Sequence, residues 1–341
     1  MGINKLHQLL KNQCPWVYQE VHLSEFAYQW ISIDVSLFMC KYKSLSDNWL
    51  ESFMNLIVCL RKNDIHCLFV FDSGHPPDKI DEREERMLQR EKLRTKIEAL
   101  ESALERYIAT DVLDDELKNY LKEFQNSPKN VQVNALKGIL EKKRRALFTI
   151  TPEDWDLLKN LFNLMKVTYY YAPLEAETMC ADLCKRGIVV GALTEDTDVL
   201  AYGTKVFLTK LDIYSNTVTK IVYEDVLQGL KLSDAEFLDL CIMCGTDYNK
   251  NIPKVGCETA YKLIKQFGSI EEIRKQKELD ISILKHERNR ELFREYERFV
   301  MDEKAMKYNG QPDLEGLGMI MDVDMNRVKR GLKAKLIFEE S

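Results

Sequence analysis

The sequence predicts an α/β protein with a parallel sheet flanked by helices. A β-branched apolar run, 188–193, leads directly into the acidic segment 195–198, which is typical of a buried parallel strand that presents polar side chains at its carboxyl end. Two further apolar runs, 30–33 and 68–71, also end in an aspartate. Helix-like segments separate these runs, and β-α-β alternation implies right-handed crossovers between parallel strands.

The first elements can be placed in chain order from their apolar spacing. A helix is expected over 2–13, and the first strand lies near 30–35. A helix containing Phe38 follows, and then a second helix over about 47–62 precedes the strand 66–71.

The segment after Asp72 is densely charged for about seventy residues and has no strand signal. Apolar residues recur there at alternating spacings of four and three, which predicts an amphipathic helix over 81–108, roughly 42 Å long. Ser127–Pro128 interrupts this pattern, and the basic cluster Lys142–Arg145 closes the insertion. For most of these charges, a solvated helix face is the simple interpretation.

The α/β pattern then resumes at Thr151–Pro152, which is typical of a helix start. The expected elements are a helix over 153–166, strands over 167–171 and 188–193 with a helix over 175–185 between them, and a hairpin of 206–211 with 218–222. Ser233 and Glu236 form a capping box for a helix that ends at Gly245, and another helix spans 257–266.

Seven acidic residues each lie just past an apolar element. They are Asp34, Asp72, Glu175, Glu177, Asp196, Asp198 and Asp247. Any one alone could be a helix cap, a first-turn charge or part of a surface loop. Together, carboxylates without histidine or thiolate partners favour Mg²⁺, with Mn²⁺ as a substitute. Seven acids suit two ions roughly 4 Å apart, an arrangement that serves displacement at the phosphorus of a phosphodiester.

Composition and charge limit the other possibilities. No apolar run approaches the roughly 20 residues needed to cross a bilayer, and a signal-peptide pattern is absent, so we expect a soluble intracellular protein without a membrane partner. The net charge of -6 does not exclude a nucleic-acid partner, because the acids lie at the expected metal site and the basic residues are clustered. The nine cysteines are best interpreted as buried free thiols, since no histidine pair at metal spacing accompanies them.

From MGINKL through DTDVLAYG to CGTDYNKNIPKVG, the chain resembles the flap endonuclease / XPG family of structure-specific 5′ nucleases. The matching motifs, VFD-x-x-x-PP, P-x-E-A-E, TED-x-D-x-L and G-x-DY, span the chain to about residue 275. The resemblance implies a PIN-like (5′–3′ exonuclease-like) fold. It also implies that the seven acids hold two Mg²⁺ ions, with Asp247 in the sphere of the second.

The family also gives the charged insertion a role, as a helical gateway and arch through which a single-stranded 5′ flap passes. Lys79 and Arg86 stand at the offsets of the lysine and arginine that contact the scissile phosphate, where they would act as electrophilic clamps. Arg83 and Arg90 are neighbours that could substitute, and an exposed amphipathic helix face is the alternative for each. Gly2 is a further expected DNA contact.

The segment 237–267 resembles the helix-two-turn-helix of the family, whose loop carbonyls bind a monovalent cation that anchors a duplex phosphate. The expected ion is K⁺, and its expected carbonyl ligands are those of Asn251, Ile252 and Val255. The expected basic contacts of this motif are Lys254, Lys262 and Lys265. Because such contacts position DNA without reading bases, selectivity should depend on junction shape.

This chain departs from the family pattern at several places. Cys257-Glu258-Thr259 stands where basic residues are usual, and Cys40 occupies the place of a base-stacking aromatic, for which Phe38 or Tyr42 could substitute. No QxxLxxFF-like segment follows residue 330, so recruitment to a processivity clamp by that route is not expected. A divergent form of this kind suits a large DNA virus or a protist.

The resemblance divides the chain into five expected parts. These are the N-terminal part of the nuclease core (1–80), the gateway and arch (81–150), the internal part of the core (151–235), the helix-two-turn-helix (236–275) and C-terminal helices packing on the core (276–341).

The leading hypothesis is a monomeric, Mg²⁺-dependent 5′ flap endonuclease with 5′–3′ exonuclease activity. It would act on branched or flapped DNA in replication, repair or recombination, in the nucleus or at a viral replication site in the cytoplasm. The alternatives are a 5′ exonuclease or Holliday-junction resolvase of the same superfamily, a PIN-like ribonuclease, and a non-catalytic DNA-binding factor.

Overall fold

A seven-stranded sheet forms the centre of the protein, with strand order β1-β7-β6-β5-β2-β3-β4. The computed structural model describes residues 2–277, 279–301, 310–321 and 328. The strands are β1 (Gln19–His22), β2 (Trp30–Asp34), β3 (His66–Phe71), β4 (Thr168–Tyr171), β5 (Gly191–Leu193), β6 (Val206–Asp212) and β7 (Thr217–Val222). Neighbours from β6 to β4 are parallel, whereas β7 runs antiparallel to both β6 and β1. The sheet is therefore mixed and mostly parallel, whereas a parallel sheet was predicted. The predicted hairpin of 206–211 with 218–222 is confirmed as the antiparallel pair β6–β7.

Two strands differ from the sequence prediction for local reasons. β1 was not predicted, because three of its four residues (QEVH) are polar and the strand alternates only between half-buried and exposed positions. β5 is shorter than the predicted run 188–193 and begins at Gly191. A Cβ atom at Gly191 would lie 2.8 Å from a methyl carbon of Leu208, so a larger residue here would have to displace that buried side chain on β6.

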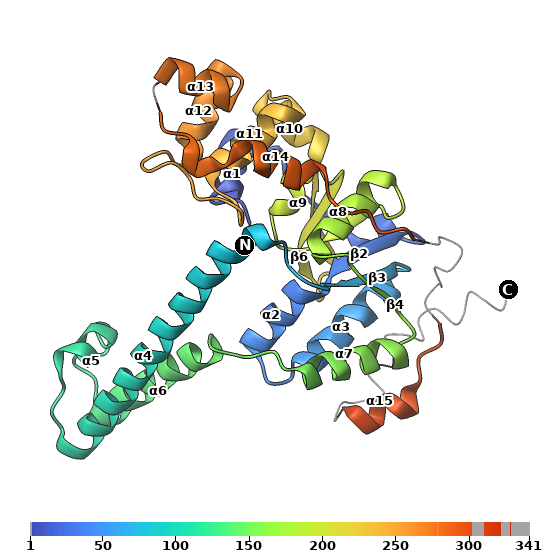
Figure 1. Ribbon diagram of the computed structural model, residues 1–341. Coiled ribbons are helices and arrows are strands. Elements are labelled where there is room, and N and C mark those ends of the chain that lie inside the picture. Colours follow the sequence, from blue (N-terminus) through green and yellow to red (C-terminus); the bar gives the residue numbers. More distant parts are fainter. Residues whose placement is uncertain (1, 278, 302–309, 322–327, 329–341) are drawn as a thin grey trace.

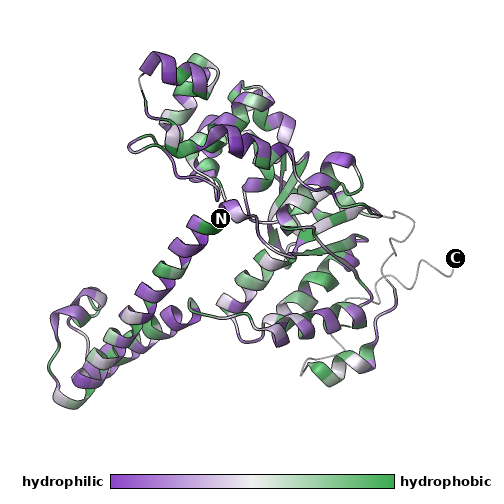
Figure 2. Cartoon of the chain, in the orientation of Figure 1, coloured by the Kyte–Doolittle hydropathy of each residue, from purple (hydrophilic) through white to green (hydrophobic). Residues whose placement is uncertain are grey.

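Helices cover both faces of the sheet (Figure 1). On one face lie α2 (Val35–Leu45), α3 (Trp49–Lys62) and α7 (Pro152–Leu164), and on the other lies α8 (Ala176–Arg186). The alternation along β3 explains this arrangement, because Leu68 and Val70 pack with α8 while Phe69 and Phe71 pack with α3 and α7. β3 accordingly appears mainly hydrophobic in Figure 2.

A third apolar cluster joins the remaining helices beside β6 and β7. These helices are α1 (Leu6–Gln13), α9 (Asp198–Ala201), α10 (Tyr223–Leu230), α11 (Asp234–Cys244), α12 (Cys257–Phe267), α13 (Ile270–Lys277) and α14 (His286–Arg294). The capping box of Ser233 and Glu236 at the start of α11 is confirmed. A last described helix, α15 (Leu314–Ile320), packs on α7. The region beyond residue 330, where no clamp-binding segment was expected, lies outside the described residues.

The charged insertion forms an arm that projects from the core (Figure 1). Its long helix α4 (Ile80–Thr110) has 31 residues, about 46 Å, and pairs with α6 (Lys129–Arg145), while the short α5 (Asp115–Tyr120) lies at the far end. The arm has its own apolar core, in which Leu100 and Leu136 are fully buried. The predicted helix over 81–108 is confirmed, and α6 begins directly after the predicted break at Pro128, whereas the ranges of α5 and α6 were not predicted.

Two sequence expectations about other features can be compared directly with the structure. All nine cysteines are free thiols, and eight of them are buried, which confirms that interpretation. Among the described residues, no helix is both long and apolar enough to span a membrane.

Arg290 joins three of the C-terminal helices. Its guanidinium donates to both carboxylate oxygens of Asp239, at 2.7 and 2.6 Å, and to Glu271 at 2.6 and 3.0 Å. The side chain of Asp239 is 4% exposed, and it also accepts a hydrogen bond from the backbone N–H of Ile270, at 3.1 Å. This network therefore fastens α14 to both α11 and α13.

Replacing Arg290 with methionine should lower the free energy of unfolding by about 3 kcal/mol, because the buried carboxylate of Asp239 loses its partner. The double variant with Asp239→Asn should lose clearly less than the sum of the two single changes. Urea unfolding followed by circular dichroism measures both effects.

Arg288→Met is the matched control, since that side chain is 53% exposed and its ion pair with Asp78 should contribute under about 1 kcal/mol. Equal losses at Arg288 and Arg290 would contradict this account.

Candidate active site

The seven predicted acids converge at one edge of the sheet, around a pocket of about 320 Å³. Six of them line it: Asp34, Asp72, Glu175, Glu177, Asp196 and Asp247. Asp198 is fully buried behind Asp196 and interacts electrostatically with Asp196, Asp247 and Glu177. The carboxyl ends of β2, β3 and β5, the start of α8 and the loop after α11 each contribute at least one acid.

Backbone N–H groups hold several of these acids in place. Asp34 caps α2 by accepting from the N–H of Leu37 at 3.1 Å, and Asp72 accepts from the N–H of Ala176 at 2.6 Å, in the first turn of α8. The N–H of Asp198 donates to Asp196 at 3.0 Å. Each of these hydrogen bonds fixes the direction of its carboxylate. The same side chains therefore both cap a backbone N–H group and point towards the pocket.

Crowding of these carboxyl groups changes their protonation. Burial, and then the nearby charges of Asp72 and Glu177, raises the pKa of Asp34 well above its usual value. Burial and Asp196 do the same to the pKa of Asp198. Burial followed by the charge of Glu177 raises the pKa of Asp196 to about 7 and that of Glu175 to about 7. The site consequently favours a cation that offsets the charge.

Lys79 supplies one positive charge directly inside this group of acids. Its Nζ lies 2.9 Å from Glu175, 2.9 Å from Glu177 and 3.4 Å from Asp247, and 5.0 Å from the ring centre of Tyr248. Burial alone would lower the pKa of Lys79, but the charges of Glu177 and its neighbours outweigh burial and raise it. Lys79 therefore remains protonated, although its side chain is only 6% exposed.

The donor set fits a hard divalent ion, although the side chains are not arranged as a finished metal site. Among the described residues, no group of three or more His, Cys, Asp or Glu side chains has a geometry that would hold a metal, and the ammonium of Lys79 lies between several of the acids. Both carboxylate oxygens of Asp198, however, are buried without a hydrogen-bond partner. An all-oxygen site with such unsatisfied acceptors suits Mg²⁺ or Mn²⁺.

Three of the four predicted arm cations face this pocket. Lys79, Arg83 and Arg86 line it, and Nη2 of Arg86 lies 3.3 Å from Asp247. Arg90 instead donates to the backbone carbonyls of Leu147 and Phe148, at 3.2 and 2.8 Å, and so ties α4 to the returning chain. The suggestion that Arg90 could substitute for Arg86 is not supported by this position.

Two residues near the acids were not singled out from the sequence. Nδ1 of His75 lies 3.5 Å from Glu175, and the hydroxyl of Tyr248 donates to Glu175 at 3.3 Å. Both lie within motifs already recognised, since His75 precedes the Pro-Pro pair and Tyr248 completes G-x-DY. Their positions inside those motifs could have identified both residues as candidates for the site.

The proposed substitutes for a base-stacking aromatic are not at the pocket. Phe38 is 2% exposed and belongs to the core, and Tyr42 packs edge-on against Phe53 at 5.1 Å between ring centres. Cys40 lines the pocket instead, together with the largely exposed Met87 on α4.

Gly2 adjoins the acidic pocket and cannot carry a side chain there. Its φ angle is +84°, and a Cβ atom would lie 2.1 Å from Oδ1 of Asp196 and 2.8 Å from the backbone nitrogen of Asp198. The chain's beginning is therefore placed against two of the predicted metal ligands, while its contact with DNA stays a prediction.

The loop between α11 and α12 contributes Asp247 to this pocket, but its second half, which holds the predicted K⁺ ligands, does not line the pocket. Within the loop, Nδ2 of Asn251 donates to the carbonyls of Ile252 and Val255, at 3.3 and 2.8 Å. Two of the three carbonyls predicted to bind K⁺ thus converge on one point, which an amide nitrogen contacts. Cation binding there stays a prediction.

The three lysines predicted to bind DNA lie on this loop and on α12. Lys254 and Lys262 are exposed, and Nζ of Lys265 donates to the hydroxyl of Tyr261 at 2.9 Å. Their DNA contacts also stay predictions.

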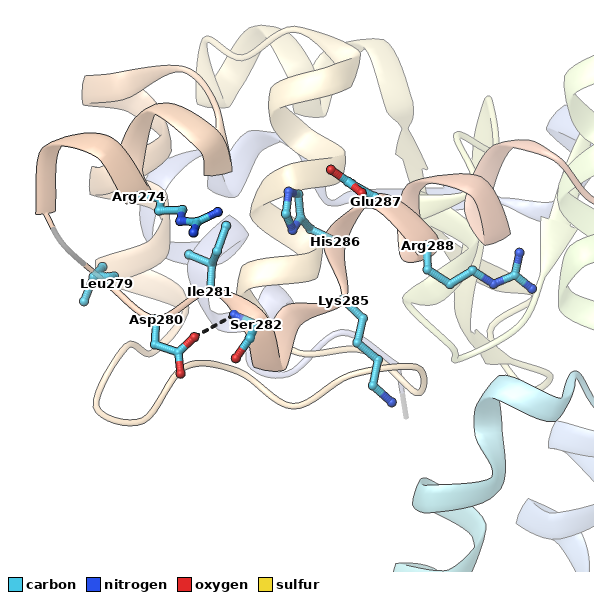
Figure 3. A pocket seen from close by; sticks show the side chains of 9 residues that line it. All are labelled: Arg274, Leu279, Asp280, Ile281, Ser282, Lys285, His286, Glu287 and Arg288. Carbon is cyan, nitrogen blue, oxygen red and sulfur yellow. Dashed lines mark hydrogen bonds between the residues drawn. The ribbon is translucent and has the colours of Figure 1, made fainter.

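A second pocket, about 630 Å³, lies between α13 and α14 (Figure 3). Its lining mixes cations such as Arg274 with acids such as Asp280, and it lacks the converging carboxylates of the first pocket. Lys285 and Arg288 point away from Arg274 in Figure 3, towards the start of α4. There they pair with Asp81 at 3.5 Å and with Asp78 at 3.1 Å, which links the base of the arm to α14.

Removing the charge of Lys79 should destabilise the metal-free protein, because the surrounding carboxylates lose their nearest cation. We expect the melting temperature of Lys79→Met in EDTA at pH 8 to fall by several degrees, in line with the loss of a buried ion pair, about 3 kcal/mol. Saturating Mg²⁺ should raise the melting temperature of this variant more than that of the wild type.

Arg83→Met, at an exposed position of the same pocket, serves as the control and should follow the wild type. Equal Mg²⁺-induced shifts in the wild type and Lys79→Met would show that the ammonium does not compete with the metal.

Comparison with known proteins gives consistent results. A family model for the XPG I-region matches residues 166–247. Probable RAD2-like endonuclease 369L of Invertebrate iridescent virus 6 is 32% identical, over 98% of this chain and 92% of its own length. Flap endonuclease 1 of Lodderomyces elongisporus is 30% identical, over 93% and 81%. In fold, the chain matches the catalytic core of Rad2 in complex with DNA substrate, with a TM-score of 0.66, 18% identity and coverage of 98% and 99%. The chain belongs to the XPG/FEN1 family of nucleases.

Proposed function

We propose that the protein is a Mg²⁺-dependent 5′ flap endonuclease with 5′–3′ exonuclease activity. It would hydrolyse DNA phosphodiesters at junctions of single and double strands during replication, repair or recombination. The observation that carries this proposal is the convergence of seven carboxyl groups on one pocket, directly below the cationic base of the arm. A protein that only bound DNA would gain nothing from an anionic pocket facing phosphates.

The acids and the arm would divide the chemistry between them. Asp34, Asp72, Glu175, Glu177, Asp196, Asp198 and Asp247 would hold two ions. Bound Mg²⁺ would supply an activated water and neutralise charge on the leaving oxygen. Lys79 and Arg86 would bind the scissile phosphate, since both side chains already lie beside the acids and can offset charge that develops on phosphate oxygens.

Binding of the duplex would use surfaces outside the pocket. Residues 251–255 of the loop after α11, with the expected K⁺ site, would contact the phosphate backbone together with the lysines on and before α12. Gly2 would lie against the strand near the cut. The division into five parts, with the arm as a gateway for the single strand, is part of the same proposal. The relatives named flap endonuclease and RAD2-like endonuclease support this reading.

The proposal predicts that the protein cuts a labelled 5′ flap at its junction only in the presence of Mg²⁺, leaving a 5′ phosphate and a 3′ hydroxyl. Blunt, nicked and four-way DNAs and the matching RNA flap should be cut more slowly. Asp196→Ala should bind the flap but cut it about 100-fold or more slowly, because a metal ligand is lost. Gel assays with end-labelled strands measure both properties.

Each contrary result points to a different enzyme or to none. Preference for the four-way DNA would indicate a resolvase, preference for RNA a ribonuclease, and binding without any cleavage a DNA-binding factor. An unchanged rate for Asp196→Ala would remove that residue from the site.

The two arginines of α4 offer a matched pair for testing the phosphate clamp. Arg86→Ala should lower kcat by about 100-fold, because its guanidinium lies beside the acids. Arg90→Ala, one turn further along α4, should stay within a few-fold of the wild type, since Arg90 contacts Leu147 and Phe148 instead. Single-turnover kinetics would measure the difference, and equal losses would contradict the assigned roles.

A further inference from the structure

Two buried thiols meet at the ends of the loop that carries Asp247. Cys244 is the last residue of α11, and Cys257 is the first residue of α12. Their Sγ atoms are 2.8 Å apart, and the residues are 1% and 5% exposed. This separation exceeds the about 2.05 Å of a disulfide by only about 0.8 Å. We propose that Cys244 and Cys257 form a reversible disulfide that closes the loop 245–256.

The first half of the loop is already held against its surroundings. Asn249 donates from Nδ2 to the carbonyl of Ile242 at 2.8 Å, and its side-chain oxygen accepts from Asn289 of α14 at 2.9 Å. The N–H of Asn4 donates to the carbonyl of Gly245 at 3.2 Å, so the beginning of the chain also holds the loop. Closing the bond requires a small movement of two sulfur atoms and leaves these contacts in place.

The reaction balances with hydrogen peroxide as the oxidant. One thiol attacks the peroxide oxygen, which gives a sulfenic acid and one water. The second thiol displaces the hydroxyl group of the sulfenic acid, which forms the S–S bond and releases a second water. Two electrons pass from the thiol pair to the peroxide, and a dithiol reductant reverses the change. Burial raises the pKa of the Cys244 thiol well above its usual value, so the reaction should be slow at neutral pH.

Cys241 is the competing partner, because it lies one turn before Cys244 on α11 and interacts electrostatically with Cys257. The 2.8 Å contact favours Cys244. Cys180 and Cys184 provide a matched control pair, since they too are buried and lie one turn apart, but on the single helix α8.

The bond can be tested on the full-length wild-type protein, without reference to its nuclease activity. The protein is treated with hydrogen peroxide in EDTA, the remaining thiols are blocked, and tryptic peptides are analysed by mass spectrometry. We expect a linked pair, 232–250 with 255–262, about 2 Da lighter than the sum of its parts, which dithiothreitol separates. Fragmentation should place the bond at Cys244.

Thermal unfolding gives an independent readout. Oxidation should raise the melting temperature of the wild type and of Cys180→Ser by about 3 °C, because the bond restricts the unfolded chain. Cys257→Ser should show neither the shift nor the linked peptides. Three outcomes would overturn the proposal. They are a bond at Cys241, complete oxidation of the thiols by peroxide without linked peptides, and an unchanged melting temperature in the linked protein.

Discussion

Mutual repulsion between buried carboxyl groups is the constraint on which the rest of this structure depends. Seven acids meet at one edge of the sheet, and burial together with their neighbours' charges raises the pKa of four of them. Such a cluster persists only where the scaffold compensates for it. Backbone N–H groups at the starts of α2 and α8 and the ammonium of Lys79 supply that compensation.

The base of the arm is positioned by charge rather than by apolar packing. The buried residues of α4 begin only at Ile97, more than four turns into the helix. Before that point, Lys79, which directly precedes α4, and Arg86 on α4 lie beside the acids. Asp78 and Asp81 in the same segment pair with Arg288 and Lys285 at the start of α14. The base of the arm is therefore held between two partners of opposite charge.

The sequence was sufficient for most of the fold because its strong signals are local. Apolar runs that end in acids predicted β2 and β3, and the four-and-three spacing predicted α4. The polar edge strand β1 has no such signal, because only its pairing with β7 makes it a strand. Convergence of the acids was also predictable, since the ends of parallel strands share one edge.

The directions of side chains within the site could not be predicted from the sequence. Arg86 and Arg90 lie one turn apart on α4, yet of these two only Arg86 faces the acids. Arg90 instead donates to the backbone carbonyl of Leu147 in the returning chain. Phe38 likewise looked available in sequence, but the packing of α2 against the sheet buries it. Both outcomes depend on contacts between segments distant in the chain.

The arm's separate apolar core has a consequence for how this architecture can vary. Leu100 and Leu136 pack only with other residues of the arm, so the far end of α4 does not share its packing with the sheet. Adding seven residues to each of α4 and α6 would extend the hairpin by about 10 Å while keeping its stripe in phase. The length of the arm can therefore vary among related proteins without changing the acidic pocket at its base.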